Sequence, residues 1–336
     1  MARKLTFGYL YDFRQGPNPA KSWAAHYAGV LDAVAWSEAA GFDGAWVPEH
    51  HCAPDGYMPS PLVALAAIAA RTKRLRIGTG VALAPLYNPV RFASDCAVLD
   101  TLSGGRLELG LAIGYRKREY AAFQAEFGKR GRIFDEFLEI VTRLWAGESV
   151  TFSGQHFTID DVAIMPTPAA GKIPLHIGGF APKALDRVAK YADGYYGNDD
   201  CVPMYLERLA AHGRDPAEAR VMVPGLFVTV AKDPEAAMEE LAPYYHYVNT
   251  VYAGWNAEDQ ALGIDNPALG VMDLEAFKTS GIFQVWTPEQ AVAKFRSMRE
   301  NFPLDHYMMA MPPGLPGDRF AAYAQVFADE VMPAFA

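Results

Sequence analysis

Cysteine is scarce in this 336-residue sequence, which contains only three. Cys52, Cys96 and Cys201 lie far apart and form no CxxC motif, so the pattern indicates neither a disulfide framework nor a cysteine-based metal site. It favours a reducing compartment. We therefore expect a cytoplasmic protein without a bound metal.

Long apolar runs and an excess of positive charge are also missing. No stretch of about 18 apolar residues is present, which argues against a membrane-spanning helix. The basic residues Arg3 and Lys4 lead straight into a strand-like segment, and not into the apolar stretch of a signal peptide. Lysine and arginine total 30 against 39 aspartates and glutamates, a net charge of −9, so no nucleic acid partner is expected.

Several common site motifs are absent as well. No GxGxxG follows a strand, because Leu83 stands where the third glycine after Gly78 and Gly80 would be needed. Neither a GxxxxGKS/T phosphate loop nor a GxSxG nucleophile motif occurs. Glu49-His50-His51 is not HExxH, and adjacent histidines do not share a helix face, so a zinc site is not favoured.

What the sequence does contain is an alternation of strand-like and helical segments. The helical segments repeat apolar residues at a spacing of three and four, most clearly from Phe134 to Trp145. This alternation predicts an α/β fold, a single (β/α)8 TIM barrel over residues 1–336. The eight expected strands are 5–11, 43–47, 75–80, 106–111, 174–178, 194–197, 221–230 and 306–311.

Two stretches interrupt the alternation. Residues 150–166, with a turn at Gly154, are expected to form a small antiparallel insertion. Residues 253–275 hold Gly, Asn, Asp and Pro without clear periodicity, so we expect a long loop there. Such a loop is typical of a mobile lid over an active site, although a surface excursion without a role is the alternative.

Residues suited to chemistry gather where the predicted strands end, which is where barrel enzymes place their sites. Glu49-His50-His51 follows the second strand, and Gly178-Gly179 leads from the fifth strand into a helix that begins near Pro182. A glycine turn before a helix N-terminus suits a phosphate group, although it can also be a plain tight turn. Aromatic residues near the strand ends predict an apolar pocket or, alternatively, barrel core: Tyr9, Tyr11, Trp46, Tyr115 and Tyr196.

Taken in order along the chain, these residues resemble the bacterial luciferase-like flavin monooxygenases, and especially the luciferase catalytic subunit. Glu49-His50-His51 matches the EHH of that family. Further short matches are Pro89-Val90-Arg91, Leu99-Asp100, Ser103-Gly104-Gly105-Arg106, Trp286-Thr287-Pro288-Glu289 and Val331-Met332-Pro333. The resemblance covers nearly the whole chain and also implies a (β/α)8 barrel, with flavin bound at its mouth.

The resemblance implies a reaction and its partners. Reduced FMN, supplied by a separate NAD(P)H:flavin reductase, would react with O2 to give a flavin C4a-(hydro)peroxide. This species would oxygenate a hydrophobic or carbonyl-bearing small molecule. The family commonly dimerises through helices near the second and third strands, so a homodimer is expected.

The resemblance also assigns roles to individual residues. His50 takes the place of the catalytic histidine, and Glu49 would orient His50 or a backbone turn. Gly80-Val81 matches a non-prolyl cis peptide under the flavin ring. The implied cofactor-binding residues are Thr79, Gly80, Val81, Ile113, Tyr115, Gly178, Gly179, Phe180, Ala181 and Lys183. The implied substrate pocket is formed by Tyr9, Tyr11, Trp46, Glu49, Tyr196 and Asn198.

One departure from the family pattern keeps other functions open. Ile113 stands where the family often carries an arginine that holds the flavin phosphate, and Arg116, Lys117 or Lys183 would have to compensate. This leaves the deazaflavin F420 as an alternative cofactor, in an F420-dependent oxidoreductase of the same superfamily. A non-catalytic flavin-binding protein and a flavin-free lyase or hydrolase are further alternatives.

Overall fold

The chain forms the closed barrel that the alternation predicts. The computed structural model describes residues 3–17, 19, 22–263 and 270–336. Eight parallel strands close in the order β1-β12-β9-β8-β7-β4-β3-β2, which confirms the (β/α)8 fold. These strands are β1 (Thr6–Leu10), β2 (Gly44–Val47), β3 (Arg76–Leu83), β4 (Leu107–Ala112), β7 (Leu175–Gly178), β8 (Gly194–Tyr196), β9 (Val221–Gly225) and β12 (Leu304–Ala310).

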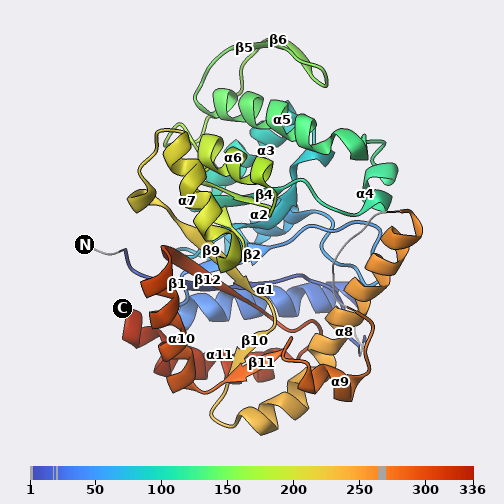
Figure 1. Cartoon of the computed structure of the whole chain (residues 1–336), viewed down its shortest axis with the longest axis vertical. Coiled ribbons are helices and arrows are strands. Elements are labelled where there is room, and N and C mark those ends of the chain that lie inside the picture. The colour runs from blue at the N-terminus through green and yellow to red at the C-terminus, as the bar shows by residue number, and fades with distance from the viewer. Residues whose placement is uncertain (1–2, 18, 20–21, 264–269) are drawn as a thin grey trace.

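Helices surround the barrel (Figure 1). Most of them bury an apolar face, as the helical spacing of apolar residues predicts. Gly104 ends one of them in the left-handed conformation, at φ 71°, which favours glycine at a helix C-terminus. The helices are α1 (Trp23–Ala39), α2 (Pro61–Arg71), α3 (Pro89–Ser103), α4 (Lys117–Ala122), α5 (Arg130–Trp145), α6 (Pro182–Tyr191), α7 (Val202–Ala211), α8 (Pro234–Ala261), α9 (Leu274–Thr279), α10 (Pro288–Asn301) and α11 (Gly317–Glu330). Short 3-10 turns lie at Ala84–Leu86, Phe127–Lys129, Asp199–Cys201, Pro216–Glu218 and Met332–Phe335.

Two small sheets lie outside the barrel. β5 (Val150–Ser153) and β6 (Thr158–Val162) pair antiparallel and stand away from the barrel at the top of Figure 1. The expected seventh strand, 221–230, is instead two strands, because β10 (Val228–Val230) leaves the barrel and pairs with β11 (Gln284–Trp286). Pro224 and Gly225 at the end of β9 are poor residues for a continuous strand, which accounts for the break.

The expected lid loop at 253–275 is wrong for its first part. Residues 253–261 belong to the 28-residue helix α8, and α9 begins at Leu274. The buried face of α8 includes the polar residues Asn249, Asn256 and Asp259, which hide the helical spacing of apolar residues in the sequence. Residues 264–269 of the expected loop lie outside the described residues.

Within the described ranges, we find no helix that is both long enough and apolar enough to cross a membrane. The same part of the chain contains no group of three or more His, Cys, Asp or Glu side chains placed to hold a metal ion.

Candidate active site at the carboxyl ends of the strands

An apolar layer fills the barrel interior below the mouth. Its buried members are Leu10, Trp46, Met222 and Met308, and Tyr196 packs against them. The Trp46 indole Nε1 donates a hydrogen bond to His306 Nε2 at 2.9 Å, which satisfies the one polar atom of that ring. The mouth therefore has a floor of apolar side chains, and the predicted pocket residue Trp46 belongs to this floor.

The end of β3 lies directly on this floor. A Cβ on Gly80 would stand 3.1 Å from Leu10 Cδ1 and 3.2 Å from Met308 Cε, so a larger residue would crowd the layer. The Gly80-Val81 peptide bond is cis, and the Gly80 carbonyl accepts a hydrogen bond from the Tyr196 hydroxyl at 3.3 Å. Neighbouring Thr79 is buried and donates its hydroxyl hydrogen to the Gly110 carbonyl at 2.7 Å.

His50, the predicted catalytic residue, is buried just beyond the end of β2 and is 8% exposed. Its Nδ1 lies 2.9 Å from Oε1 of Glu119, a fully buried carboxylate in α4. The same oxygen accepts the backbone N–H of His51 at 2.9 Å. Because a carboxylate only accepts hydrogen bonds, Nδ1 is the protonated nitrogen of a neutral His50 ring.

Four aromatic rings surround His50. The ring centroids of Tyr57 and Trp255 lie 4.7 and 4.9 Å from that of His50, and those of Tyr115 and Tyr252 lie 5.7 and 6.1 Å away. Burial lowers the pKa of His50 below its usual value, and Glu119 opposes this shift. The imidazole is therefore neutral at pH 7 and can accept a proton at Nε2.

Among the described residues, Glu49 makes no side-chain hydrogen bond to His50, and it ties the end of β2 to the end of β3. Its Oε2 accepts the backbone N–H of Leu83 at 2.6 Å. Its Oε1 lies 2.7 Å from the Tyr87 hydroxyl and 2.9 Å from His51 Nε2. Of the two roles expected for Glu49, the structure supports the one on a backbone turn.

Helix α8 reaches across this side of the mouth (Figure 1, orange). The Arg116 guanidinium is 2% exposed, lies 3.9 Å above the Trp255 ring and donates to the His51 carbonyl at 3.0 Å. Its Nη2 lies 3.5 Å from a Glu258 carboxylate oxygen of α8. Arg116 is thus engaged beside His50, and it is not free to replace a missing phosphate arginine.

The turn between β7 and α6 forms another part of the rim. Gly179 has φ 146°, and a Cβ there would lie 2.6 Å from the Ala184 Cβ, so the turn requires glycine. The N-cap residue is Ala181, whose side chain cannot accept a hydrogen bond, and no acidic residue occupies the first turn of α6. Lys183 is exposed, and Phe180 is 68% exposed. An uncapped helix N-terminus with a nearby lysine suits an anion.

The predicted pocket residues Tyr9 and Tyr11 lie on the helix side of the barrel wall, although Tyr11 also lines a separate cavity beside the mouth. The Tyr9 ring packs between Phe42 and Phe320, and the Tyr11 hydroxyl lies 2.6 Å from Ser37 Oγ of α1. Side chains alternate along a strand, so Tyr9 and Tyr11 face the helices because Leu10 between them faces the barrel interior. Asn198 is exposed at the start of a 3-10 turn. The partly buried Ile113 accepts the Tyr120 hydroxyl at its carbonyl oxygen.

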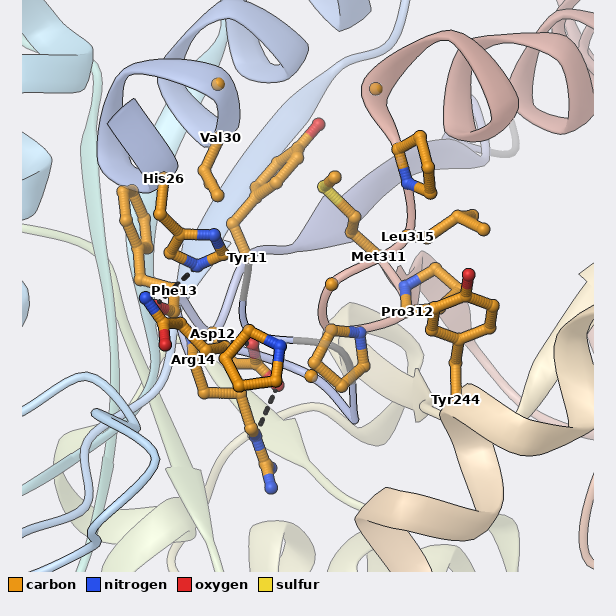
Figure 2. Close-up of a pocket in the computed structure, with 18 of the residues that line it drawn as sticks. Tyr11, Asp12, Phe13, Arg14, His26, Val30, Tyr244, Met311, Pro312 and Leu315 are labelled. Atoms are coloured by element: carbon orange, nitrogen blue, oxygen red, sulfur yellow. Dashed lines mark hydrogen bonds and ion pairs between the residues drawn. The ribbon is translucent and has the colours of Figure 1, made fainter. Parts of the chain in front are cut away.

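A cavity of about 360 Å3 lies beside the mouth, between the segments that follow β1 and β12 (Figure 2). His26 and Val30 of α1 line one side, Met311 and Leu315 the other, and Tyr244 comes from α8. His50 does not line this cavity. Arg14 does, and its guanidinium lies 3.9 Å above the Tyr57 ring, which in turn contacts His50.

Sequence reasoning missed the residues that hold His50. Glu119 follows the fourth strand, as the other rim residues follow theirs, and this position is the signal that could have found it. Tyr252 and Trp255 are three residues apart and so share one face of α8, but Trp255 falls in the stretch 253–275 that was expected to be a loop. Arg14 gives no signal in the sequence, since its burial depends on Asp12 and Tyr57.

Comparison with known proteins identifies the family. The model of the luciferase-like monooxygenase family matches residues 5–305, and this chain therefore belongs to that family, as the motifs indicate.

Individual relatives fall into more than one functional group. The chain is 32% identical over 218 residues to an F420-dependent glucose-6-phosphate dehydrogenase of Microbacterium testaceum, covering 62% of this chain and 61% of that protein. It is 30% identical over 246 residues to 4-hydroxyprotoasukamycin monooxygenase of Streptomyces nodosus subsp. asukaensis, covering 66% and 64%. The chain thus spans less than two thirds of the length of these curated relatives. The solved structure of monooxygenase RslO1 from Streptomyces bottropensis shares the fold, with a TM-score of 0.82, 24% identity, and 98% and 100% of the two chains covered.

Proposed function

We propose that this protein is a flavin-dependent monooxygenase that uses reduced FMN and O2 to oxygenate an apolar or carbonyl-bearing small molecule. The observation that carries the proposal is the neutral, buried His50, held at Nδ1 by Glu119 and enclosed by aromatic rings at the barrel mouth. A histidine in this state can take a proton at Nε2 in a site that the rings shield from water.

The mouth has features that suit a phosphorylated, planar cofactor. The apolar floor under Gly80 suits a flat ring system, and the uncapped N-terminus of α6 with Lys183 suits a phosphate. Reduced FMN, when bound, supplies the activation of O2, and a separate NAD(P)H:flavin reductase would provide it. Thr79, Val81, Gly178 and the other predicted cofactor residues remain candidates for its contacts.

The proposed substrate class follows from the cavity beside the mouth. Phe13, Val30, Met311 and Leu315 give it largely apolar walls, and Arg14, which also lines it, contacts the Tyr57 ring that packs on His50. An apolar molecule in this cavity would lie on the same side of the mouth as the proton acceptor.

An F420-dependent oxidoreductase is the second candidate. It is favoured by Ile113, which cannot hold a phosphate, and by the engagement of Arg116 with Trp255 and Glu258. The likeness to an F420-dependent dehydrogenase also supports it.

A binding experiment distinguishes the two cofactors. Purified protein is titrated anaerobically with reduced FMN, reduced riboflavin and reduced F420, and binding is followed by fluorescence or calorimetry. We expect FMN to bind more tightly than riboflavin, which lacks the phosphate. Lys183→Ala should reduce this advantage by about tenfold, as loss of a charge-assisted contact would. The matched control is Lys190→Ala at the other end of α6, which should have no effect.

Turnover then tests the reaction. With a flavin reductase, NADH, 18O2 and a panel of apolar ketones, aldehydes and terpenes, the proposal requires a product that carries label from O2. If the protein binds F420 tightly and no other flavin, and consumes substrate only when F420 is present, the F420-dependent oxidoreductase is the correct function.

A homodimer remains a proposal. Val63 of α2 and Val98 and Leu102 of α3 are 72%, 44% and 66% exposed, and they give two neighbouring helices an apolar outer surface. Light scattering after size exclusion tests it, and a mass of twice 36.8 kDa is expected.

A further inference from the structure

We propose that Glu119 is the positioning residue of His50: it holds the imidazole in one orientation, with the proton on Nδ1 and Nε2 free to accept a proton. The chemical use of Nε2 rests on the proposed function. The arrangement itself does not, and it can be tested on the protein without any cofactor.

Two hydrogen bonds to a single oxygen fix the geometry. Glu119 Oε1 accepts the His50 Nδ1–H and the backbone N–H of His51, each at 2.9 Å. Arg116 Nη1 lies 3.5 Å from this oxygen and donates to the His51 carbonyl at 3.0 Å. The ring of His50 and the backbone of the following residue are therefore both held by the α4 segment, so the ring cannot turn without breaking a buried hydrogen bond.

The second oxygen of Glu119 indicates that the carboxylate is not merely a structural anchor. Oε2 is buried and has no hydrogen-bond partner among the residues that the structure describes. Leaving a buried carboxylate oxygen unpaired costs stability, and such a cost is typical of functional sites. Glu49, by comparison, uses both of its oxygens in bonds to Leu83, Tyr87 and His51.

The charged groups near His50 shift its pKa in opposite directions. Arg116 and Arg14 lower the pKa of His50, while Glu119 raises it. Burial raises the pKa values of the neighbouring phenols, so these stay neutral: Tyr57, Tyr115 and Tyr252. Glu119 is therefore the negative group, among the described residues facing His50, that supports the basicity of its ring.

The chain offers a matched control in the neighbouring histidine. His51 pairs through Nε2 with Glu49, whereas His50 pairs through Nδ1 with Glu119. Two adjacent histidines thus contact two different buried glutamates, and each glutamate can be changed separately.

The experiment is 15N NMR of protein labelled at its eight histidines, with a His50→Gln variant used to assign the His50 signals. In the wild-type protein at neutral pH, we expect His50 to show a protonated Nδ1 and an unprotonated Nε2. Glu119→Gln keeps an acceptor oxygen, so it should retain this tautomer and lower the pKa of His50. Glu119→Ala should give a mixture of tautomers. Glu49→Gln should change the His51 signals and leave those of His50 as they are.

Two outcomes would overturn the proposal. One is a wild-type His50 with its proton on Nε2, which requires no variant to fold. The other is a Glu119→Gln protein whose His50 titrates as in the wild type. If the protein binds FMN, Glu119→Gln should also lower kcat by at least tenfold and leave KM within about twofold. Failure to bind any flavin would reject the proposed function and leave the NMR result standing.

Discussion

Replacing Glu49 with alanine is expected to destabilise the protein by about 3–5 kcal/mol. The Glu49 side chain is 2% exposed and meets three polar groups: the Leu83 N–H, the Tyr87 hydroxyl and the His51 ring. A buried donor left without its acceptor costs about 1–3 kcal/mol. The Leu83 N–H has no freedom to turn elsewhere, whereas the Tyr87 hydroxyl and the His51 ring can partly adapt, so the sum stays below three full penalties.

Glutamine at the same position separates hydrogen bonding from charge. Its oxygen can accept the Leu83 N–H, and its amide can donate to a reversed Tyr87 hydroxyl and to His51 in the other tautomer, so Glu49→Gln should cost only about 1 kcal/mol. Tyr87→Phe removes one charge-assisted bond and should cost about 1.5 kcal/mol. Free energies of unfolding from urea titration measure all three. Equal costs for Gln and Ala, or an Ala variant within 1 kcal/mol of the wild type, would refute the hydrogen-bond account.

Further predictions concern the barrel interior. Glu108→Gln should lower the free energy of unfolding by about 3 kcal/mol because it removes the buried carboxylate charge that pairs with the partly buried Arg76 and Arg220, whereas Asp95→Asn in an exposed ion pair should change it by less than about 0.5 kcal/mol; urea unfolding measures both. Met308→Ala should cost about 2–5 kcal/mol by opening a cavity in the floor, measured in the same way and contradicted by a cost below 1 kcal/mol. Burial, followed by nearby Arg76, holds the pKa of His306 well below its usual value, so the unfolded chain binds a proton first as the pH falls below about 6.5. Stability should therefore decline from pH 7 to pH 5, and His306→Gln should flatten that decline; an unchanged slope would show that another group causes it.

The fold could be predicted because each barrel strand is buried on both sides. Continuous apolar stretches such as Gly44 to Val47 leave few alternatives to a parallel strand, and the segments between the strands repeat with helical spacing. The strand prediction was wrong where two residues interrupt an otherwise apolar segment. Val221 to Val230 is one apolar stretch, but Pro224 and Gly225 let the chain leave the barrel after β9.

The candidate site was predicted only in part, for a geometric reason. Most strand ends could be located to within a residue or two, which placed His50 beyond the end of β2, but β3 runs to Leu83, three residues past its expected end at Gly80. The side to which a strand residue points changes with every position, so the pocket assignment for Tyr9 depended on a register that the sequence does not specify.

Contacts from α8 could not be predicted at all from periodicity. Its inner face mixes Trp255 with the buried polar residues Asn256 and Asp259, and these side chains lie inside only because α4 and the loop after β2 face them. Burial of this kind is decided by the partner element, and it leaves no apolar stripe in the sequence.

The two parts of the mouth differ in a way that bears on how the site could evolve. Around His50, the side chains of Glu49, Glu119 and Arg116 are buried and bonded to backbone groups, so a change there alters the stability of the barrel as well as its chemistry. Phe180 and Lys183 on the α6 turn are exposed, and among the described residues no side-chain hydrogen bond holds them. The α6 turn can therefore change at little cost in stability. Relatives of this chain include an F420-dependent dehydrogenase and a monooxygenase, so we expect the α6 turn to vary more among family members than the buried surroundings of His50.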